Sequence, residues 1–170
     1  MKSILIALDY DPTAQIIAET GYELARSLEA EITLLHVISD EIYYYSRAYS
    51  PIMGFAGFTT ADTFEIGQQE HLKEAAYNYL DKTRNHLGDM NMRTMVKEGD
   101  FADVIVETAD VVEANIIVMG THSRRWLEKI VMGSVTEKVM KLSRRPILLI
   151  PTGNYDQEKT DIKSEKSENK

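Results

Sequence analysis

The sequence predicts an α/β fold, a Rossmann-like open sheet of five parallel strands with helices on both faces. Short apolar runs rich in β-branched residues alternate with longer segments in which apolar residues recur at helical spacing. Because parallel strands need a crossover between them, this alternation favours a parallel sheet covered on both faces. A chain of 170 residues is long enough for one domain with a substantial core. The expected strands are residues 3–8, 31–38, 92–98, 116–119 and 147–150, and the expected helices are residues 12–28, 64–87, 100–114 and 133–142.

The first strand is expected to be buried on both faces, because its residues are continuously apolar until Asp9 ends the run. Asp11 and Pro12 fit the N-cap and the first position of the helix that follows, which extends to about Leu28. In the second half, Asp100 fits the N-cap of a helix. The strand at residues 92–98 alternates apolar with charged side chains, which predicts an edge strand or a half-exposed face.

Residues 40–63 fit neither a helix nor a strand, and they are rich in aromatic side chains between Tyr43 and Phe58. A loop of this length inside a compact domain is usually functional or mobile, and its aromatic content argues against plain disorder. We expect it to cover a ligand, the edge of its own domain or a partner subunit. Residues 152–170 are charged and have Ile162 as their single aliphatic side chain, so we expect a disordered tail outside a domain of residues 1–151.

The composition excludes several classes of function. A net charge of −8 argues against a general binder of nucleic acid or of anionic membranes, although a local basic loop is compatible with it. The chain has no cysteine, which rules out disulfides, thiolate chemistry and cysteine-based metal sites. The apolar start is too short for a secretory signal, and no run approaches the length of a membrane span. We therefore expect a cytoplasmic protein.

A loop bounded by glycines follows the fourth strand. Gly120 ends the strand, and Gly133 and Ser134 begin a helix after thirteen residues. The free amides at a helix N-terminus and the helix dipole favour an anion, so this arrangement predicts a phosphate site. The alternative is that Ser134 and Glu137 form a capping box without any ligand.

The spacing Gly120-x-x-Ser123-x9-Gly133-Ser134 resembles the nucleotide-binding signature of the universal stress proteins, Gly-x-x-Gly-x9-Gly-Ser/Thr, with three of the four marked positions matching. The resemblance covers residues 1–151 and rests also on the order of the elements. It implies the adenine nucleotide alpha hydrolase-like version of the fold. It also implies an adenine nucleotide (ATP, ADP or AMP) as the ligand, with Mg2+ present only beside a triphosphate.

The resemblance also assigns roles to individual residues. It places Asp9 against the ribose, Val37 beside adenine and Met119 near the base. The alternatives are a helix cap for Asp9 and a plain core role for Val37 and Met119. Around the phosphates it places the loop glycines with Ser123, Arg124, Ser134 and Val135.

Ser123 departs from the signature, because glycine there would allow a positive φ and a close approach of the phosphates to the backbone. The serine hydroxyl can donate a hydrogen bond instead, and Arg124, Arg125 and Lys129 can screen charge. In the family, loss of the glycine signature marks members that do not bind ATP. A member of the family that binds no nucleotide and acts as a dimeric interaction module is therefore the first alternative.

Catalytic residues are not expected, because the sequence contains none of the common glycine-rich or nucleophile motifs. A weak nucleotide hydrolase or phosphotransferase that uses the same loop is the second alternative. His36 lies inside a strand, and the histidines lack zinc-site spacing, so none is assigned a role. The apolar last strand, residues 147–150, is the expected contact of a homodimer, as the resemblance also implies.

Overall fold

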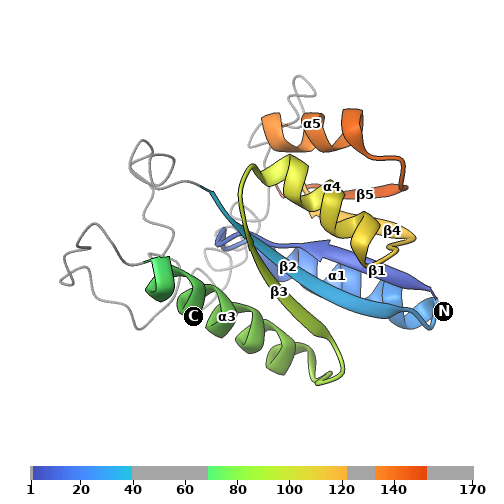
Figure 1. The fold of residues 1–170 in the computed structure, drawn as a ribbon. Helices are drawn as coiled ribbons and strands as arrows, with labels where there is room; N and C mark the ends of the chain where they lie inside the picture. Colours follow the sequence, from blue (N-terminus) through green and yellow to red (C-terminus); the bar gives the residue numbers. More distant parts are fainter. Residues whose placement is uncertain (1, 40–68, 122–132, 153–170) are drawn as a thin grey trace, which may run out of the picture.

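The structure is a computed structural model that describes residues 2–39, 69–121 and 133–152. These residues form a five-stranded sheet between two layers of helices (Figure 1). The predicted fold class is thereby confirmed. In chain order the elements are β1 (Ser3–Ala7), α1 (Ala14–Ser27), β2 (Glu31–Ile38), α3 (Gln69–Leu87), β3 (Arg93–Glu98), α4 (Phe101–Val111), β4 (Ile116–Gly120), α5 (Ser134–Leu142) and β5 (Ile147–Ile150).

The strands are parallel and lie in the order β3-β2-β1-β4-β5. The chain builds outward from β1 to β2 and β3, and then returns to the other side of β1 to place β4 and β5. The strand order therefore reverses between β1 and β4, where Ile6 is paired with Val118. In open α/β sheets, ligands bind beyond the carboxyl ends of the strands at such a switch point.

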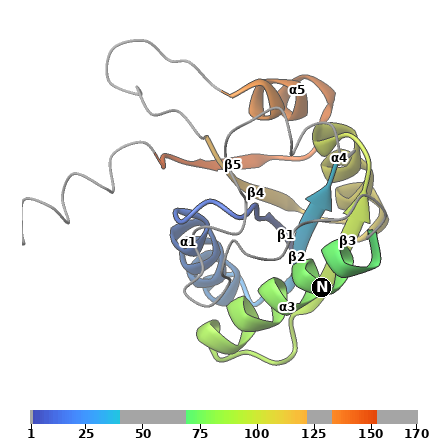
Figure 2. The same ribbon diagram turned by 90° about the vertical axis from the view of Figure 1, so that its left-hand side faces the viewer.

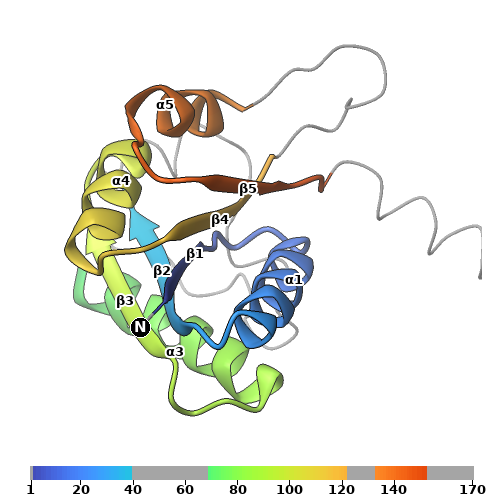
Figure 3. The same ribbon diagram turned by 90° about the vertical axis from the view of Figure 1, so that its right-hand side faces the viewer.

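The two faces of the sheet have separate cores, which the alternation of side chains along each strand explains. Ile6 and Leu34 face α1 and α3, whereas Leu5 and Leu35 face α4 and α5. Figures 2 and 3 show the two pairs of helices on opposite sides of the sheet. Burial on both faces is the reason why the central strands are continuously apolar rather than alternating.

The start of α1 differs from the prediction. The helix begins at Ala14 with Thr13 as its N-cap, so Asp11 is not the cap and Pro12 lies in the preceding turn. The carboxylate of Asp11 accepts hydrogen bonds from the backbone N of Thr13 at 2.9 Å and from its hydroxyl at 2.6 Å. This Asx turn holds the chain outside the helix for two further residues.

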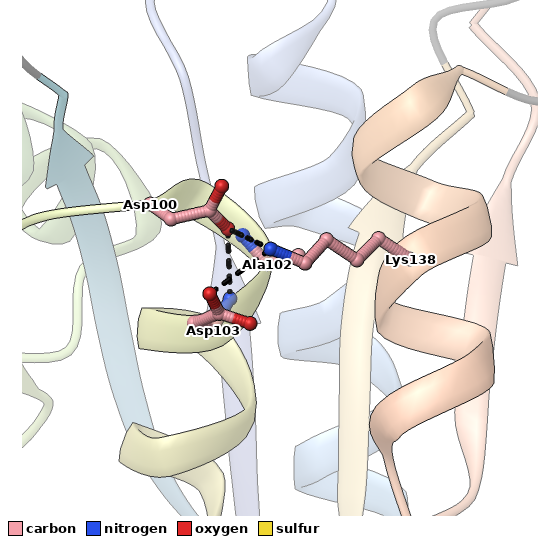
Figure 4. Close-up of polar contacts among 4 residues, drawn as sticks. All are labelled: Asp100, Ala102, Asp103 and Lys138. Atoms are coloured by element: carbon pink, nitrogen blue, oxygen red, sulfur yellow. Dashed lines mark hydrogen bonds and ion pairs between the residues drawn. The ribbon is translucent and has the colours of Figure 1, made fainter.

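The start of α4 agrees with the prediction, because the Asp100 carboxylate accepts hydrogen bonds from the amides of Ala102 and Asp103. The pKa of Asp100 is lowered, most strongly by the hydrogen bond from the Asp103 amide, and also by the neighbouring Lys138 and the bond from the Ala102 amide. Lys138 of α5 lies 3.0 Å from Asp100 and 2.9 Å from Asp103 (Figure 4). The N-terminus of α4 is thereby tied to the first turns of α5.

Several predictions fall on residues that the structure does not describe. These are the aromatic segment 40–63, the loop residues Ser123 and Arg124, and the tail beyond Thr152. Within the described ranges, no helix combines the length and the apolar character needed to cross a bilayer.

Candidate functional site

Asp9 and Gly120 flank the switch point of the sheet, as the sequence predicted. Asp9 lies two residues beyond the end of β1, and Gly120 is the last residue of the adjacent β4. The Asp9 side chain is half-buried, and its Oδ1 accepts a hydrogen bond from the amide of Asp11 at 3.1 Å. A carboxylate is thus held at the carboxyl end of a buried strand.

Two side chains from other elements support the backbone on either side of Asp9. The His36 Nδ1 lies 2.9 Å from the carbonyl oxygen of Leu8, and the Tyr79 hydroxyl donates to the carbonyl oxygen of Asp9 at 2.7 Å. Because a carbonyl oxygen can only accept, the His36 proton belongs on Nδ1. The Tyr10 ring packs on both, with ring centroids 4.3 Å from His36 and 5.1 Å from Tyr79.

The side chains of His36 and Tyr79 are both neutral near pH 7. Burial lowers the pKa of His36 and outweighs the opposing effects of its hydrogen bond to Leu8 and of the Asp9 charge. Burial, with the charge of Asp9 second, raises the pKa of Tyr79 far above its ordinary value, so its hydroxyl remains a donor. The sequence pattern predicts no role for either residue. The signal in the sequence is a histidine within a strand whose other residues are mostly apolar and buried.

The end of β4 and the start of α5 are joined by hydrogen bonds. The Gly133 amide donates to the carbonyl oxygen of Thr121 at 3.3 Å, and the Thr136 hydroxyl donates to that of Gly120 at 3.3 Å. These bonds bring the two ends of the glycine-bounded loop together. The hydroxyl of Thr121 is buried and has no hydrogen-bond partner among the described residues.

The alternative reading of Ser134 as a helix cap is wrong. Gly133 is the N-cap of α5, and Ser134 is its first helical residue. The Glu137 carboxylate pairs with Lys141 at 2.6 Å instead of reaching back to the cap. Among the described residues, no side chain accepts from the first-turn amides at Ser134 and Val135, and amides at this place in a helix are the donors that an anion uses.

Gly120 has a packing reason to be glycine that does not depend on any ligand. A Cβ at this position would lie 2.5 Å from Ile17 Cδ1 and 3.2 Å from Thr152 Cγ2. Both distances are shorter than ordinary van der Waals contact. The first glycine of the signature therefore allows α1 to approach the end of β4.

Val37 and Met119 lie near the carboxyl ends of the strands on either side of β1 and on the same face of the sheet. Each is 5% exposed and packs in the core beneath α4 and α5. The core role is therefore present, and a contact with a base stays a prediction. In the described part of the chain, no group of three or more His, Asp and Glu side chains could hold a metal ion.

Comparisons with known proteins bear on the family and the fold of the chain. The model of the universal stress protein family matches residues 1–151. Universal stress protein MJ0577 of Methanocaldococcus jannaschii is 32% identical over 157 residues, which are 90% of this chain and 96% of that protein. A solved structure of the hypothetical protein MJ0577 superposes with a TM-score of 0.64 at 26% identity, covering 89% of this chain and 96% of that one.

Two further structures with the same fold contain nucleotides. A universal stress protein in complex with cAMP has a TM-score of 0.58 at 15% identity and covers 88% of this chain and 96% of its own. The universal stress protein from Archaeoglobus fulgidus in complex with dAMP has a TM-score of 0.56 at 19% identity, covering 88% of this chain and 98% of its own. At these identities the likeness shows the fold alone.

Proposed function

The chain belongs to the universal stress protein family, and from this premise we propose that it is a regulatory protein that binds an adenine nucleotide at the switch point between β1 and β4. The observation that carries the proposal is that two complementary groups lie near the carboxyl ends of these adjacent strands. Asp9 offers a half-buried acceptor, and the first turn of α5 offers backbone donors that no described side chain uses.

The acceptor and the donors fit the two polar parts of a nucleotide, the ribose and the phosphates. Asp9 accepts hydrogen bonds from ribose hydroxyls, while the amides at Ser134 and Val135 and the positive end of the α5 dipole hold phosphate oxygens. The buried hydroxyl of Thr121 also lacks a partner among the described residues. A buried polar atom of this kind favours a site completed by a polar ligand or by water.

The remaining assignments complete the proposed site. Val37 and Met119 form an apolar wall for adenine, Ser123 donates through its hydroxyl, and Arg124 screens phosphate charge. Mg2+ enters only with a triphosphate, because its preferred ligands there are phosphate oxygens and water. The cAMP and dAMP complexes of related proteins support an adenine mononucleotide as one form of the ligand.

We further propose that the protein acts in the cytoplasm as a homodimer and by binding rather than by catalysis. β5 lies at an edge of the sheet, and three of its four residues are only partly buried. An apolar edge strand of this kind can pair with a second copy about a twofold axis. The surfaces of such a dimer, or the aromatic segment Tyr43 to Phe58, provide the regulatory output.

Native mass spectrometry of gently purified protein, followed by titration calorimetry with AMP, ADP, ATP and cAMP, tests the nucleotide proposal. We expect wild-type protein to bind at least one of them and Asp9→Asn to weaken binding about tenfold, as for a lost charged hydrogen bond. Glu107→Gln removes one exposed carboxylate on α4 and serves as the matched control. No heat with any of the four would leave the dimeric interaction module as the function.

The hydrolase alternative is tested separately by phosphate release from Mg-ATP. We expect release by wild-type protein to equal that of a blank without protein. Release that exceeds the blank and is lost in Asp9→Ala would instead identify a weak hydrolase that uses this site.

A further inference from the structure

The two peptide groups on either side of the Asp9 Cα atom are both held by side chains from outside β1. His36 of β2 donates to the Leu8 carbonyl, which belongs to the peptide before Asp9. Tyr79 of α3 donates to the Asp9 carbonyl, which belongs to the peptide after it. Because these two peptide planes set the backbone angles of Asp9, they also set the direction in which its side chain leaves the chain.

The surroundings leave these donors little freedom. His36 is 2% exposed and Tyr79 is 8% exposed. Tyr10 contacts both rings, and the His36 and Tyr79 ring centroids are 5.9 Å apart. The backbone amide of Leu8 also donates to the carbonyl of Leu35 at 2.9 Å, which extends the β1–β2 pairing to the residue before Asp9.

This construction exceeds what a strand end requires. Hydrogen bonds between β1 and β2 already support the backbone as far as the Leu8 amide. Two further buried donors, from His36 and Tyr79, bind the carbonyl oxygens of Leu8 and Asp9. Burying a histidine and a tyrosine hydroxyl is unfavourable unless each makes a hydrogen bond. A ligand group is bound well only if neighbouring side chains lock its direction.

We propose that His36 and Tyr79 are positioning residues that clamp the backbone of Asp9 and thereby aim its carboxylate at the ligand. The inference rests on the proposed nucleotide site for its effect on affinity, but the clamp itself is a property of the protein alone. Tyr79 is the cleaner residue to test, since Tyr79→Phe removes the hydroxyl and retains the ring that packs on Tyr10.

A double-mutant cycle separates positioning from a merely structural role. NMR titration with AMP gives dissociation constants for wild type, Tyr79→Phe, Asp9→Ala and the double variant. We expect Tyr79→Phe to weaken binding about two- to tenfold when Asp9 is present, the range that one net hydrogen bond predicts. It should have no effect in the Asp9→Ala background, because there is no carboxylate left to aim.

Tyr77→Phe is the matched control, since Tyr77 lies on the same helix and is 44% exposed. It should leave binding unchanged in both backgrounds. Equal weakening by Tyr79→Phe with and without the Asp9 carboxylate would overturn the positioning role, because it would show that the hydroxyl acts through general stability.

A second measurement needs no nucleotide and so separates failure of the clamp from failure of the proposed function. The Asp11 amide donates to Asp9 Oδ1, so its hydrogen exchange reports how firmly the carboxylate is held. Tyr79→Phe should speed this exchange about two- to tenfold relative to Tyr77→Phe. The amide of Ala109, in the core on the opposite face, should not accelerate by the same factor.

The outcomes are distinct. If wild-type protein binds no adenine nucleotide but the Asp11 amide responds as expected, the clamp stands and the nucleotide function fails. If the Asp11 amide exchanges at the same rate in Tyr79→Phe and Tyr77→Phe, or accelerates only as much as Ala109, the clamp is overturned. His36→Asn, which keeps a donor close to the position of Nδ1, should retain more Asp11 protection than His36→Leu.

Discussion

Replacing Gly120 by alanine tests whether the first glycine of the loop is required by packing. The added Cβ would lie 2.5 Å from Ile17 Cδ1, 3.2 Å from Thr152 Cγ2 and 3.5 Å from Ile17 Cγ1. Ile17 is 1% exposed and belongs to the core between α1 and the sheet. Its terminal methyl group therefore has no solvent to move into, and α1 or the Ile17 rotamer must shift.

The expected cost follows from two opposing effects. Overpacking a well-filled core costs about 1–3 kcal/mol. Gly120 lies in β4 and is not among the glycines with positive φ, so alanine meets no backbone penalty and stabilises by about 0.4–1 kcal/mol through the unfolded chain. The net loss in the free energy of unfolding should be on the order of 1–2 kcal/mol.

Urea denaturation of a double-mutant cycle measures this directly. Ile17→Val removes the Cδ1 that the new methyl group would meet, and alone it should cost about 0.5–1.5 kcal/mol. The Gly120→Ala, Ile17→Val double variant should then be more stable than the sum predicts by about 1 kcal/mol. Ile105→Val, on the opposite face of the sheet, is the matched control and should add independently.

Strict additivity of Gly120→Ala with Ile17→Val would refute the packing argument. The experiment is done without nucleotide, so a contact between the Gly120 backbone and phosphate cannot contribute to it. If the compensated double variant also binds AMP as wild type does, then the position must be small for the sake of α1 and not for the sake of the ligand.

Three further predictions concern other parts of the molecule. Asp100→Ala should lower the free energy of unfolding by about 1 kcal/mol through loss of the α4 cap, with Lys138→Met, which removes only an exposed partner, costing much less in the same urea titration. Burial lowers the pKa of His36 below its ordinary 6.5, so the unfolded chain binds more protons at this residue than the folded chain does. The resulting contribution to stability is present above about pH 6.5 and is lost as the pH falls through the folded pKa. Thermal denaturation from pH 8 to 5 should show that His36→Asn lacks this pH-dependent contribution. Leu149→Lys in β5 should shift sedimentation from dimer to monomer, whereas Met140→Lys on the exposed side of α5 should not, and a monomeric wild-type protein would contradict the proposed dimer.

The strands were predictable because the physics that selects them is local. A run such as residues 31–38 has too few residues for a helix, and its apolar side chains demand burial on both faces, so its bounds agree with β2. The edge position of β3 was also indicated by alternating charges. Asp100 was identifiable as a cap because its carboxylate, unlike the neighbouring Gly99, can accept hydrogen bonds from the first-turn amides.

Errors arose where two local signals compete. Asp11 and Thr13 are both good cap residues two positions apart, and the hydrogen bonds from Thr13 to the Asp11 carboxylate decide that Thr13 precedes the helix. Ser134 and Glu137 have the spacing of a capping box, but Glu137 pairs with Lys141 one turn later and Gly133 takes the cap position. In each case the sequence spacing is compatible with either residue as the cap and does not indicate which one the structure uses.

The support beneath the candidate site could not be predicted, because it depends on contacts between distant parts of the chain. Tyr79 lies 70 positions from Asp9, and His36 lies 28 positions from Leu8. In the sequence Tyr79 is one of several apolar positions along a helix, and nothing local distinguishes it. Helical spacing separates the buried Tyr79 from the exposed Tyr77, but it does not indicate that the Tyr79 hydroxyl reaches the Asp9 carbonyl.

These contacts divide the support of the candidate site between the two layers of helices. Asp9 is held from the face that α1 and α3 cover, through Tyr79 and His36. The carbonyl of Gly120 is held from the other face, through Thr136 of α5. A movement of α3 would therefore reach the acceptor end of the site without reaching the donor end.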